Sequence, residues 1–368
     1  MPHASWFMPG GARPTHGRAV AAALTTMLLG TVVVAQQPPT FKAGTTLVDV
    51  SAIVTRDGVP VGGLGQDDFR VLDNGVEQSL VAFEYVALTA VGGPDQGRDF
   101  VLVIDDWHIF PNWTPQVRDV AQAFARALGP HDRLALVTTG PHQVAVDLTT
   151  DRTAIDAAIA RLHGQQPTGP PAPFETELRA RGAFDVIRQV ADSLKGDAAE
   201  RRTIVLVSEG HQLLTDGVAR LGDDPAVLAM YMDVVRDAAL ANVAIYAIDP
   251  RGLMAPSPGF VGGGPHMSMS MAAHASANSA QAMARRRFGS LGTMALHTGG
   301  TLTVDTNDLT ADIPQIIRDS RQYYRLAYVQ PEPAPGKRQP SSRRIEVKVK
   351  SRGLEVRARQ RYVPTTAG

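Results

Sequence analysis

The stretch that decides the fold is FVLVI, Phe100–Ile104, followed directly by Asp105 and Asp106. Its apolar residues form an unbroken run, which is typical of a strand that is covered on both faces. An amphipathic segment at 115–128 follows, and then a second apolar run at 134–138. Strands that alternate with helices in this way predict a doubly wound, mostly parallel sheet.

The alternation continues downstream of this stretch. One strand, 144–148, follows its predecessor across the tight Gly140-Pro141 turn, and it is expected to be antiparallel because so short a connection cannot cross over. We therefore predict an α/β, Rossmann-like domain over residues 98–319. Further helices are expected at 152–162, 177–194, 225–242 and in a segment ending near 297, and further strands at 203–207, 244–248 and 301–304.

Strand-like alternation flanks the α/β region on both sides. Between 41 and 86 apolar residues recur at every second position, interrupted by glycine-containing turns. The pattern returns at 323–329 and in a final hairpin of 345–350 with 354–362. The economical arrangement is a small antiparallel β module, built from residues 36–97 and 320–364, with the α/β domain inserted into it. Basic residues that alternate with Val and Leu are expected to form the solvent-exposed face of the hairpin.

Composition excludes several classes of function. Lys+Arg and Asp+Glu each total 36, so no overall field draws the protein to nucleic acid or to an anionic membrane. The absence of Cys excludes thiol nucleophiles, disulfides and iron–sulfur clusters. No Gly-x-Ser-x-Gly, no phosphate-binding Gly-x-x-x-x-Gly-Lys and no His-Glu-x-x-His motif is present, so the sequence does not predict an enzyme.

The N-terminus resembles a secretory signal peptide. Arg13 and Arg18 precede the apolar stretch 19–35, which ends in Val33-Val34-Ala35. This order of charged, apolar and small residues predicts cleavage near Ala35, and no later stretch is long enough to span a bilayer. We expect an exported protein, periplasmic or secreted.

An ordered series of short motifs covers most of the chain after residue 47. The motifs are Asp73-Asn74-Gly75, Pro130-His131-Asp132-Arg133-Leu134, Ser208-Glu209-Gly210, Ile248-Asp249-Pro250-Arg251-Gly252, Thr298-Gly299-Gly300 and Tyr323-Tyr324-Arg325. In this order they resemble the VWFA-related family that is abundant in acidobacterial genomes. The resemblance implies a von Willebrand factor type A domain, a fold used mainly for binding proteins, and it implies no defined biochemical activity.

The same resemblance implies a metal-dependent adhesion motif, Asp-x-Ser-x-Ser, after the first strand of the α/β sheet. Asp105 matches its first position, but Trp107 and Ile109 stand where the serines should be. Glu209 occupies the position of a second Asp, and Thr168 and Thr176 lie in roughly the loop that supplies a Thr. The motif is therefore degenerate, and tight Mg²⁺ binding is not expected.

A different set of metal ligands is suggested by topology. The strands 100–104 and 203–207 are expected to be neighbours, and ligands bind outside the carboxyl ends of such strands. Two imidazoles and carboxylates suit Zn²⁺ better than Mg²⁺. The alternative is that these are solvated loop residues without a metal. The candidate ligands are Asp105, Asp106, His108, Glu209 and His211.

Large apolar residues share the first of these loops. Exposed, Trp107, Phe110 and Trp113 would form a rim that binds a protein partner; packed down, they would cover the end of the sheet. We predict an exported binding or adhesion module with no certain cofactor. The alternatives are a Zn-type metal-binding or metallohydrolase-like protein and a structural component of the cell envelope.

Overall fold

The computed structural model describes residues 46–88, 97–168, 172–196, 200–210, 225–253, 289–333 and 336–365. Residues 41–368 form one compact unit. The expected signal segment, 1–35, lies outside the described residues. Within the described part of the chain, no helix is long and apolar enough to cross a membrane.

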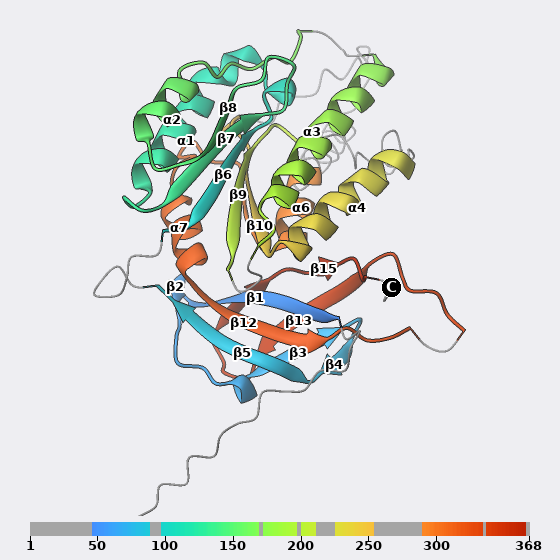
Figure 1. Ribbon diagram of the computed structural model, residues 1–368. Helices are drawn as coiled ribbons and strands as arrows, with labels where there is room; N and C mark the ends of the chain where they lie inside the picture. The colour runs from blue at the N-terminus through green and yellow to red at the C-terminus, as the bar shows by residue number, and fades with distance from the viewer. Residues whose placement is uncertain are drawn as a thin grey trace, which may run out of the picture. The chain divides into compact units, whose positions relative to one another are not determined.

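A six-stranded mixed sheet occupies the middle of the chain (Figure 1). All neighbouring strands run parallel except β7 and β8, which are antiparallel, as the short Gly140-Pro141 connection predicts. The strands lie across this sheet in the order β8-β7-β6-β9-β10-β11. When they are counted from 1 to 6 along the chain, this is the order 3-2-1-4-5-6 of a doubly wound fold. The strands are β6 (Asp99–Ile104), β7 (Arg133–Thr138), β8 (Ala145–Thr149), β9 (Arg202–Val207), β10 (Val243–Ile248) and β11 (Leu302–Thr303).

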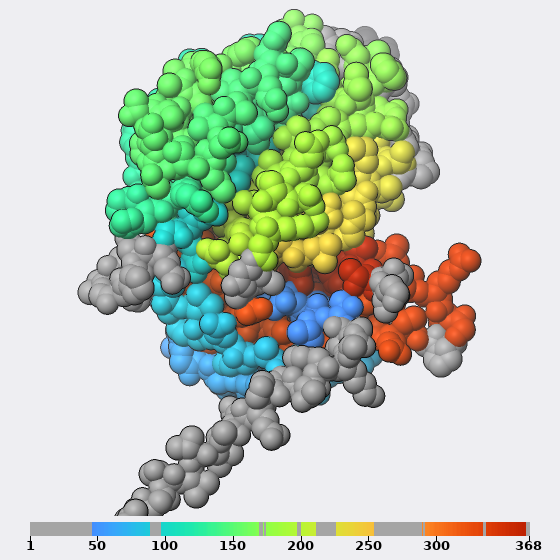
Figure 2. Space-filling view, in the orientation of Figure 1, coloured from blue at the N-terminus to red at the C-terminus, as the bar shows by residue number. Residues whose placement is uncertain are grey.

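Helices cover both faces of this sheet. Even-numbered residues of β6, such as Leu102, pack with α1 (Thr114–Ala127), α2 (Arg152–Ile159) and α7 (Ile313–Arg321). Odd-numbered residues, such as Val103, pack with the helices of the other face. The unbroken apolar run therefore reflects two cores, one on each side of the sheet. The helices of the second face are α3 (Pro173–Ser193), α4 (Pro225–Leu240) and α6 (Ser290–Thr298), and α3 and α4 lie side by side in Figure 2.

The two flanks of the chain meet in two antiparallel sheets. β1 (Leu47–Arg56) pairs with β12 (Gln322–Val329), and β3 (Phe69–Asp73) pairs with β13 (Arg343–Val349). Strands from both ends of the chain thus share one core, while the division into domains at 97/98 and 319/320 stays a prediction. The other strands are β2 (Val59–Pro60), β4 (Val76–Gln78), β5 (Leu80–Ala87), β14 (Glu355–Ala358) and β15 (Arg361–Tyr362), and the 3-10 turn η1 covers Gln66–Asp68.

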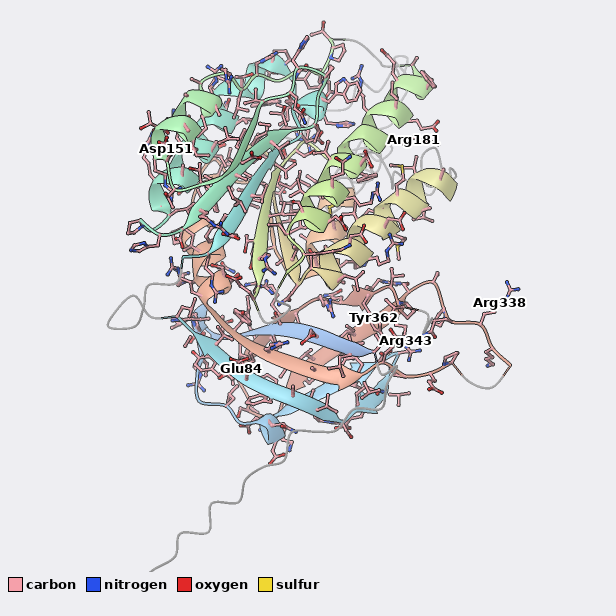
Figure 3. The ribbon with its side chains drawn as sticks, in the orientation of Figure 1. Glu84, Asp151, Arg181, Arg338, Arg343 and Tyr362 are labelled. Atoms are coloured by element: carbon pink, nitrogen blue, oxygen red, sulfur yellow. The ribbon has the colours of Figure 1, made fainter. Side chains whose placement is uncertain are left out.

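The predicted C-terminal hairpin is wrong. β13 pairs with β3 and β15, whereas β14 crosses to the other sheet and pairs with β1. The basic residues are accordingly not all solvent-exposed, because Arg359 is buried and Arg343 pairs with the buried Asp73 at 2.6 Å. Tyr362, labelled with Arg343 in Figure 3, faces it across β13 and β15 and donates to the same Asp73 carboxylate at 2.7 Å.

A buried polar cluster joins these sheets to the α/β layers. Tyr246 on β10 donates to Asp319 on α7 at 2.9 Å, and Arg357 on β14 forms an ion pair with the same carboxylate. Arg201, just before β9, donates to the Tyr246 hydroxyl at 3.2 Å. Nearby, the Ser51 hydroxyl of β1 donates to Asn242 at 3.0 Å. These contacts fix the β strands against the amino edge of the mixed sheet.

Candidate functional site

The candidate site lies where the strand order reverses, at the carboxyl ends of β6 and β9. These strands are neighbours and parallel, as predicted, so the loops that follow them emerge at one edge of the sheet. The loop after β6 contains the 3-10 turns η2 (Asp106–His108) and η3 (Pro111–Trp113). We call residues 105–113, 139–140 and 208–210 the carboxyl rim.

Asp105 ties the loops of the carboxyl rim together. Its side chain is 0% exposed. One carboxylate oxygen accepts the Thr139 hydroxyl at 2.6 Å and lies 2.9 Å from Nδ1 of His108, and the other accepts the Ser208 hydroxyl at 2.6 Å. The loops after β6, β7 and β9 are therefore held by one buried carboxylate. Charge-assisted hydrogen bonds of this length are strong, and satisfied buried networks rigidify their surroundings.

Asp106 anchors a fourth segment. One of its carboxylate oxygens accepts the backbone N–H of Gly140 at 2.7 Å, and the other accepts the Gln165 side-chain amide at 2.5 Å. The backbone N–H of Gln165 also donates to the Asp106 carbonyl at 2.7 Å. Burial raises the pKa of Asp106, against the lowering effect of these hydrogen bonds. Asp106 thus fixes the loop after α2 against the loops after β6 and β7.

Glu209 hydrogen-bonds to the backbone of the loop after β6. Its carboxylate accepts the backbone N–H of Phe110 at 2.8 Å. Burial raises its pKa to about 7, although the Phe110 hydrogen bond and the charge of Arg251 act in the opposite direction. Arg251 itself donates from Nε to both carboxylate oxygens of Asp249, at 2.8 and 3.1 Å. Glu209 is therefore a half-buried carboxyl group close to its titration point at neutral pH.

These positions do not fit the adhesion-motif metal that the sequence resemblance implies. Both oxygens of Asp105 already accept protein hydroxyls, and Ile109, at a position where the motif has Ser, is 1% exposed. In the described part of the chain, no three His, Asp or Glu side chains are placed to hold a metal ion. The fifth candidate for Zn²⁺ binding, His211, lies outside it. Zn²⁺ binding by the predicted set therefore stays a prediction.

The aromatic residues of the rim are half-buried. Trp113 packs against the core that α1 and α7 share. The Trp107 ring lies against α3, where a Cβ added to Gly182 would come within 3.0 Å of it. Trp107, Phe110 and Trp113 are all intermediate in exposure. They cover the end of the sheet and are still partly exposed at the surface. The loop therefore has features of both predicted roles, the cover over the sheet and the rim that binds a partner.

Two hydroxyl groups that donate to Asp105, those of Thr139 and Ser208, were not predicted from the sequence. The Thr that contacts Asp105 is Thr139, which follows β7 directly; Thr168 is exposed, and the Thr176 hydroxyl donates to the carbonyl of Ala172, just before α3. Ser208, rather than Glu209, reaches Asp105 from β9. The signal for both is a hydroxyl residue just after a buried parallel strand next to β6, because such positions converge at one edge.

An exposed apolar pair was also not predicted. Phe174 and Leu178 are 72% and 46% exposed and lie one turn apart at the start of α3, the helix that contacts Trp107. Residues four apart share one face of a helix. They extend the apolar surface beside the rim.

No family model and no curated protein sequence matches this chain. Solved structures do match it. A von Willebrand factor type A protein from Catenulispora acidiphila is 13% identical, with 88% of this chain and 75% of that chain covered and a TM-score of 0.34. A pilus adhesin from Lactobacillus rhamnosus GG is 10% identical, with 80% and 48% covered and a TM-score of 0.36. A proximal thread matrix protein from the mussel byssus, with a zinc-occupied MIDAS motif, is 13% identical, with 64% and 48% covered and a TM-score of 0.34. Likeness at this level identifies neither ligand nor partner, so the function has to come from this chain's own geometry.

Proposed function

We propose that this chain is an adhesion-type binding module that recognises a protein partner through the carboxyl rim. The observation that carries the proposal is the hydrogen-bond network of Asp105. Hydroxyls from the loops after β7 and β9 and the imidazole of His108 all contact this one buried carboxylate. Loops held in one geometry before binding lose little conformational entropy when a partner docks.

The chemistry of the rim is mixed, as expected for a protein interface. Trp107, Phe110 and Trp113 present parts of their rings, and Phe174 and Leu178 add exposed apolar surface next to them. Half-buried aromatic side chains contribute large contact areas at low entropic cost and are enriched at interface hot spots. Glu209 and the Arg251–Asp249 pair add polar groups at the same edge.

The arrangement of Ser208, His108 and Asp105 favours binding over nucleophilic catalysis. In a catalytic triad, the Ser hydroxyl donates to the His ring, which in turn donates to the Asp. Here the Ser208 hydroxyl donates directly to Asp105, and Nδ1 of His108 lies against the same carboxylate. The hydroxyl is thus engaged by an acceptor that cannot pass its proton to a leaving group through His108.

We further propose that the protein is exported, periplasmic or secreted, with cleavage near Ala35. The support is the order of charged, apolar and small residues between Arg13 and Ala35. Intact mass of the protein recovered outside the cytoplasm tests this: the product should begin near Gln36. A recovered product that retains residues 19–34 would contradict cleavage.

A capture experiment tests the binding function. The chain from Gln36 onward is immobilised, exposed to a cell-envelope extract of its source, and compared with Phe110→Ala and Phe174→Ala variants. Val76→Ala is the matched control, because Val76 is 64% exposed on β4, away from the rim. We expect a saturable partner whose capture falls at least about tenfold in the rim variants, the scale of a hot-spot truncation, and is unchanged in the control.

The same experiment separates the alternatives. Capture should be insensitive to chelator, because the residues present do not fit the adhesion-motif metal. Loss with chelator and recovery with Zn²⁺ would favour the metal-binding alternative. Capture that is equal in wild type and rim variants would place the functional face elsewhere, and the absence of any saturable partner would favour a structural role.

A further inference from the structure

The carboxyl rim carries a net negative charge. Its residues include the carboxylates of Asp105, Asp106 and Glu209 and no Lys or Arg, although acidic and basic residues balance over the whole chain. Even with a protonated His108 the rim stays net negative. The charge of Arg251 acts on Glu209 from outside the rim, but Arg251 already forms an ion pair with Asp249. A partner that approaches this edge therefore meets local negative charge.

Glu209 has a carboxylate oxygen that the described residues leave free. Both oxygens of Asp105 and both of Asp106 accept hydrogen bonds. In Glu209, Oε1 accepts the backbone N–H of Phe110 at 2.8 Å, whereas Oε2 accepts no hydrogen bond from the described part of the chain. Oε2 is not one of the buried polar atoms that lack a partner there, so it is open to solvent. A donor on another molecule can therefore reach it.

The charge of Glu209 is poorly compensated in the free protein. Arg251 directs its guanidinium to Asp249, donating from Nε to both carboxylate oxygens at 2.8 and 3.1 Å. Its charge lowers the pKa of Glu209, but burial outweighs this effect and raises that pKa to about 7. Because folding has already removed part of the hydration of Glu209, a cation that joins it gains an ion pair with little further desolvation of the carboxylate.

Aromatic side chains in the same loop favour a guanidinium over other cations. Trp107 and Phe110 are half-buried, and the loop that contains them donates the N–H that holds Glu209. A guanidinium is planar, weakly hydrated and able to stack on aromatic faces, whereas an ammonium is compact and strongly hydrated. A carboxylate of the partner would instead meet like charge. The chemistry of the rim therefore selects an arginine side chain.

We propose that the protein partner of the carboxyl rim inserts an arginine side chain that pairs with Oε2 of Glu209. The inference rests on the proposed binding function and adds to it the charge of the partner's contact residue. A divalent metal at this edge would attract a carboxylate of the partner, so the proposed contact has the opposite sign. The network of Asp105 holds the loops of the rim in place before the arginine arrives.

Selection from a library of random peptides tests the proposal. The chain from Gln36 onward is immobilised at pH 8, where Glu209 is mostly ionised. Peptides that bind the wild type and lose binding to Phe110→Ala are retained as rim-directed peptides. We expect these peptides to share an arginine, because the rim offers a free carboxylate oxygen beside aromatic rings. A shared acidic residue, or the lack of any shared cation, would overturn the proposal.

A double-mutant cycle locates the ion pair. One rim-directed peptide is synthesised with its arginine and with citrulline, which has nearly the same shape but no charge. Citrulline should weaken binding to the wild type at least about tenfold and have little effect with Glu209→Gln, which keeps an oxygen for the Phe110 N–H. Glu355→Gln, at an exposed position on β14, is the matched control and should retain the full citrulline effect. Equal citrulline effects on wild type and Glu209→Gln would contradict the proposal.

The selection also separates a failure of this inference from a failure of the proposed function. Rim-directed peptides without a shared cation leave the binding function intact and remove only the arginine contact. Peptides that bind the wild type, Phe110→Ala and Phe174→Ala equally well contradict the binding function of the rim and the arginine contact together. The same conclusion follows when no peptide is enriched.

Discussion

At the scale of single residues, Asp105 is the position on which the rim depends. Asp105→Asn replaces one acceptor oxygen by an amide donor that faces hydroxyls and removes the charge that both hydrogen bonds use. Because the site is fully buried, we expect the free energy of unfolding to fall by about 3 kcal/mol. Urea unfolding measures this, with the exposed Asp156→Asn as the control. If Asp105→Asn lowered the free energy of unfolding no more than the control does, the hydrogen bonds of Asp105 would not hold the loops together.

Glu209 predicts a pH dependence of stability. Its pKa is raised from 4.5 to about 7 in the folded protein, mainly by burial. Below pH 4.5 both states carry the proton, and between pH 4.5 and 7 only the folded state keeps it, so the free energy of unfolding falls as pH rises through this window. Allowing for partial exposure, the loss is about 2 kcal/mol.

Glu209→Gln removes that titration and still accepts the Phe110 N–H. Its free energy of unfolding should therefore exceed that of the wild type at pH 8 but not at pH 4, measured by urea unfolding at both pH values. Glu355→Gln, at an exposed position on β14, is the control and should track the wild type. A wild-type advantage at pH 8 would show that the Glu209 charge is stabilised rather than penalised.

Metal binding is also decided by individual side chains. Isothermal calorimetry should show no tight Mg²⁺ binding, since the Asp105 oxygens accept hydroxyls and the motif serines are replaced by Trp107 and Ile109. Any Zn²⁺ binding should vanish in a His108→Ala, His211→Ala double variant. Tight Mg²⁺ binding that Asp105→Ala abolishes would contradict this account of the site.

The residue-level picture could be predicted only in part. Asp105 could be predicted as a residue of the site because it directly follows a buried apolar run. The partners of Asp105 were not, because Thr139 and Ser208 are separated from it by 34 and 103 residues and only the strand order brings them together. The direction of the Glu209 side chain depends on one backbone N–H in another loop, which no sequence pattern encodes.

At the scale of elements, the pairing of β1 with β12 and β14 predicts the effect of truncation. A chain that ends after Asp319 lacks β12 and β14, the two long-range partners of β1, and the β13 partner of β3, and it keeps only the short β2 beside β1. We expect it to lose cooperative melting by circular dichroism, because unpaired strand edges and an opened core remain. Removal of residues 366–368 alone is the control. Melting of the truncated chain at the full-length temperature would show that the N-terminal strands fold without them.

Strands and helices with a clear period were predicted well, and the C-terminal elements were not. The α7 helix was overlooked, although Ile313, Ile316 and Ile317 have helical spacing and Pro314 lies in the first turn, where proline is tolerated. The C-terminal hairpin was misread because alternation shows that one face of a strand is polar but not what that face contacts. Arg357 faces Asp319 on α7 rather than water.

At the scale of the whole molecule, the cluster around Tyr246 predicts that both parts of the fold unfold together. Tyr246→Phe removes a hydroxyl that donates to Asp319 and accepts from Arg201 in a fully buried site. We expect a single calorimetric transition in wild type and variant, with a loss of about 2 kcal/mol in the variant. Tyr85→Phe, 37% exposed on β5, is the control. Two separated transitions in the wild type would show that the β sheets and the α/β layers unfold independently.

The long-range pairing of β1 with β12 also determines when these strands can pair during translation. Asp49 and Arg325, which bridge β1 and β12, are 276 residues apart in the chain. At about 5–20 residues per second, a ribosome needs about 14–55 s to add the residues between them. During that interval β1 has only the two-residue β2 to pair with, and β5 lacks its β12 partner. The pairing of β1 and β5 with β12 therefore cannot form until translation has passed β12, and a chaperone that shields apolar strands has that whole interval in which to act.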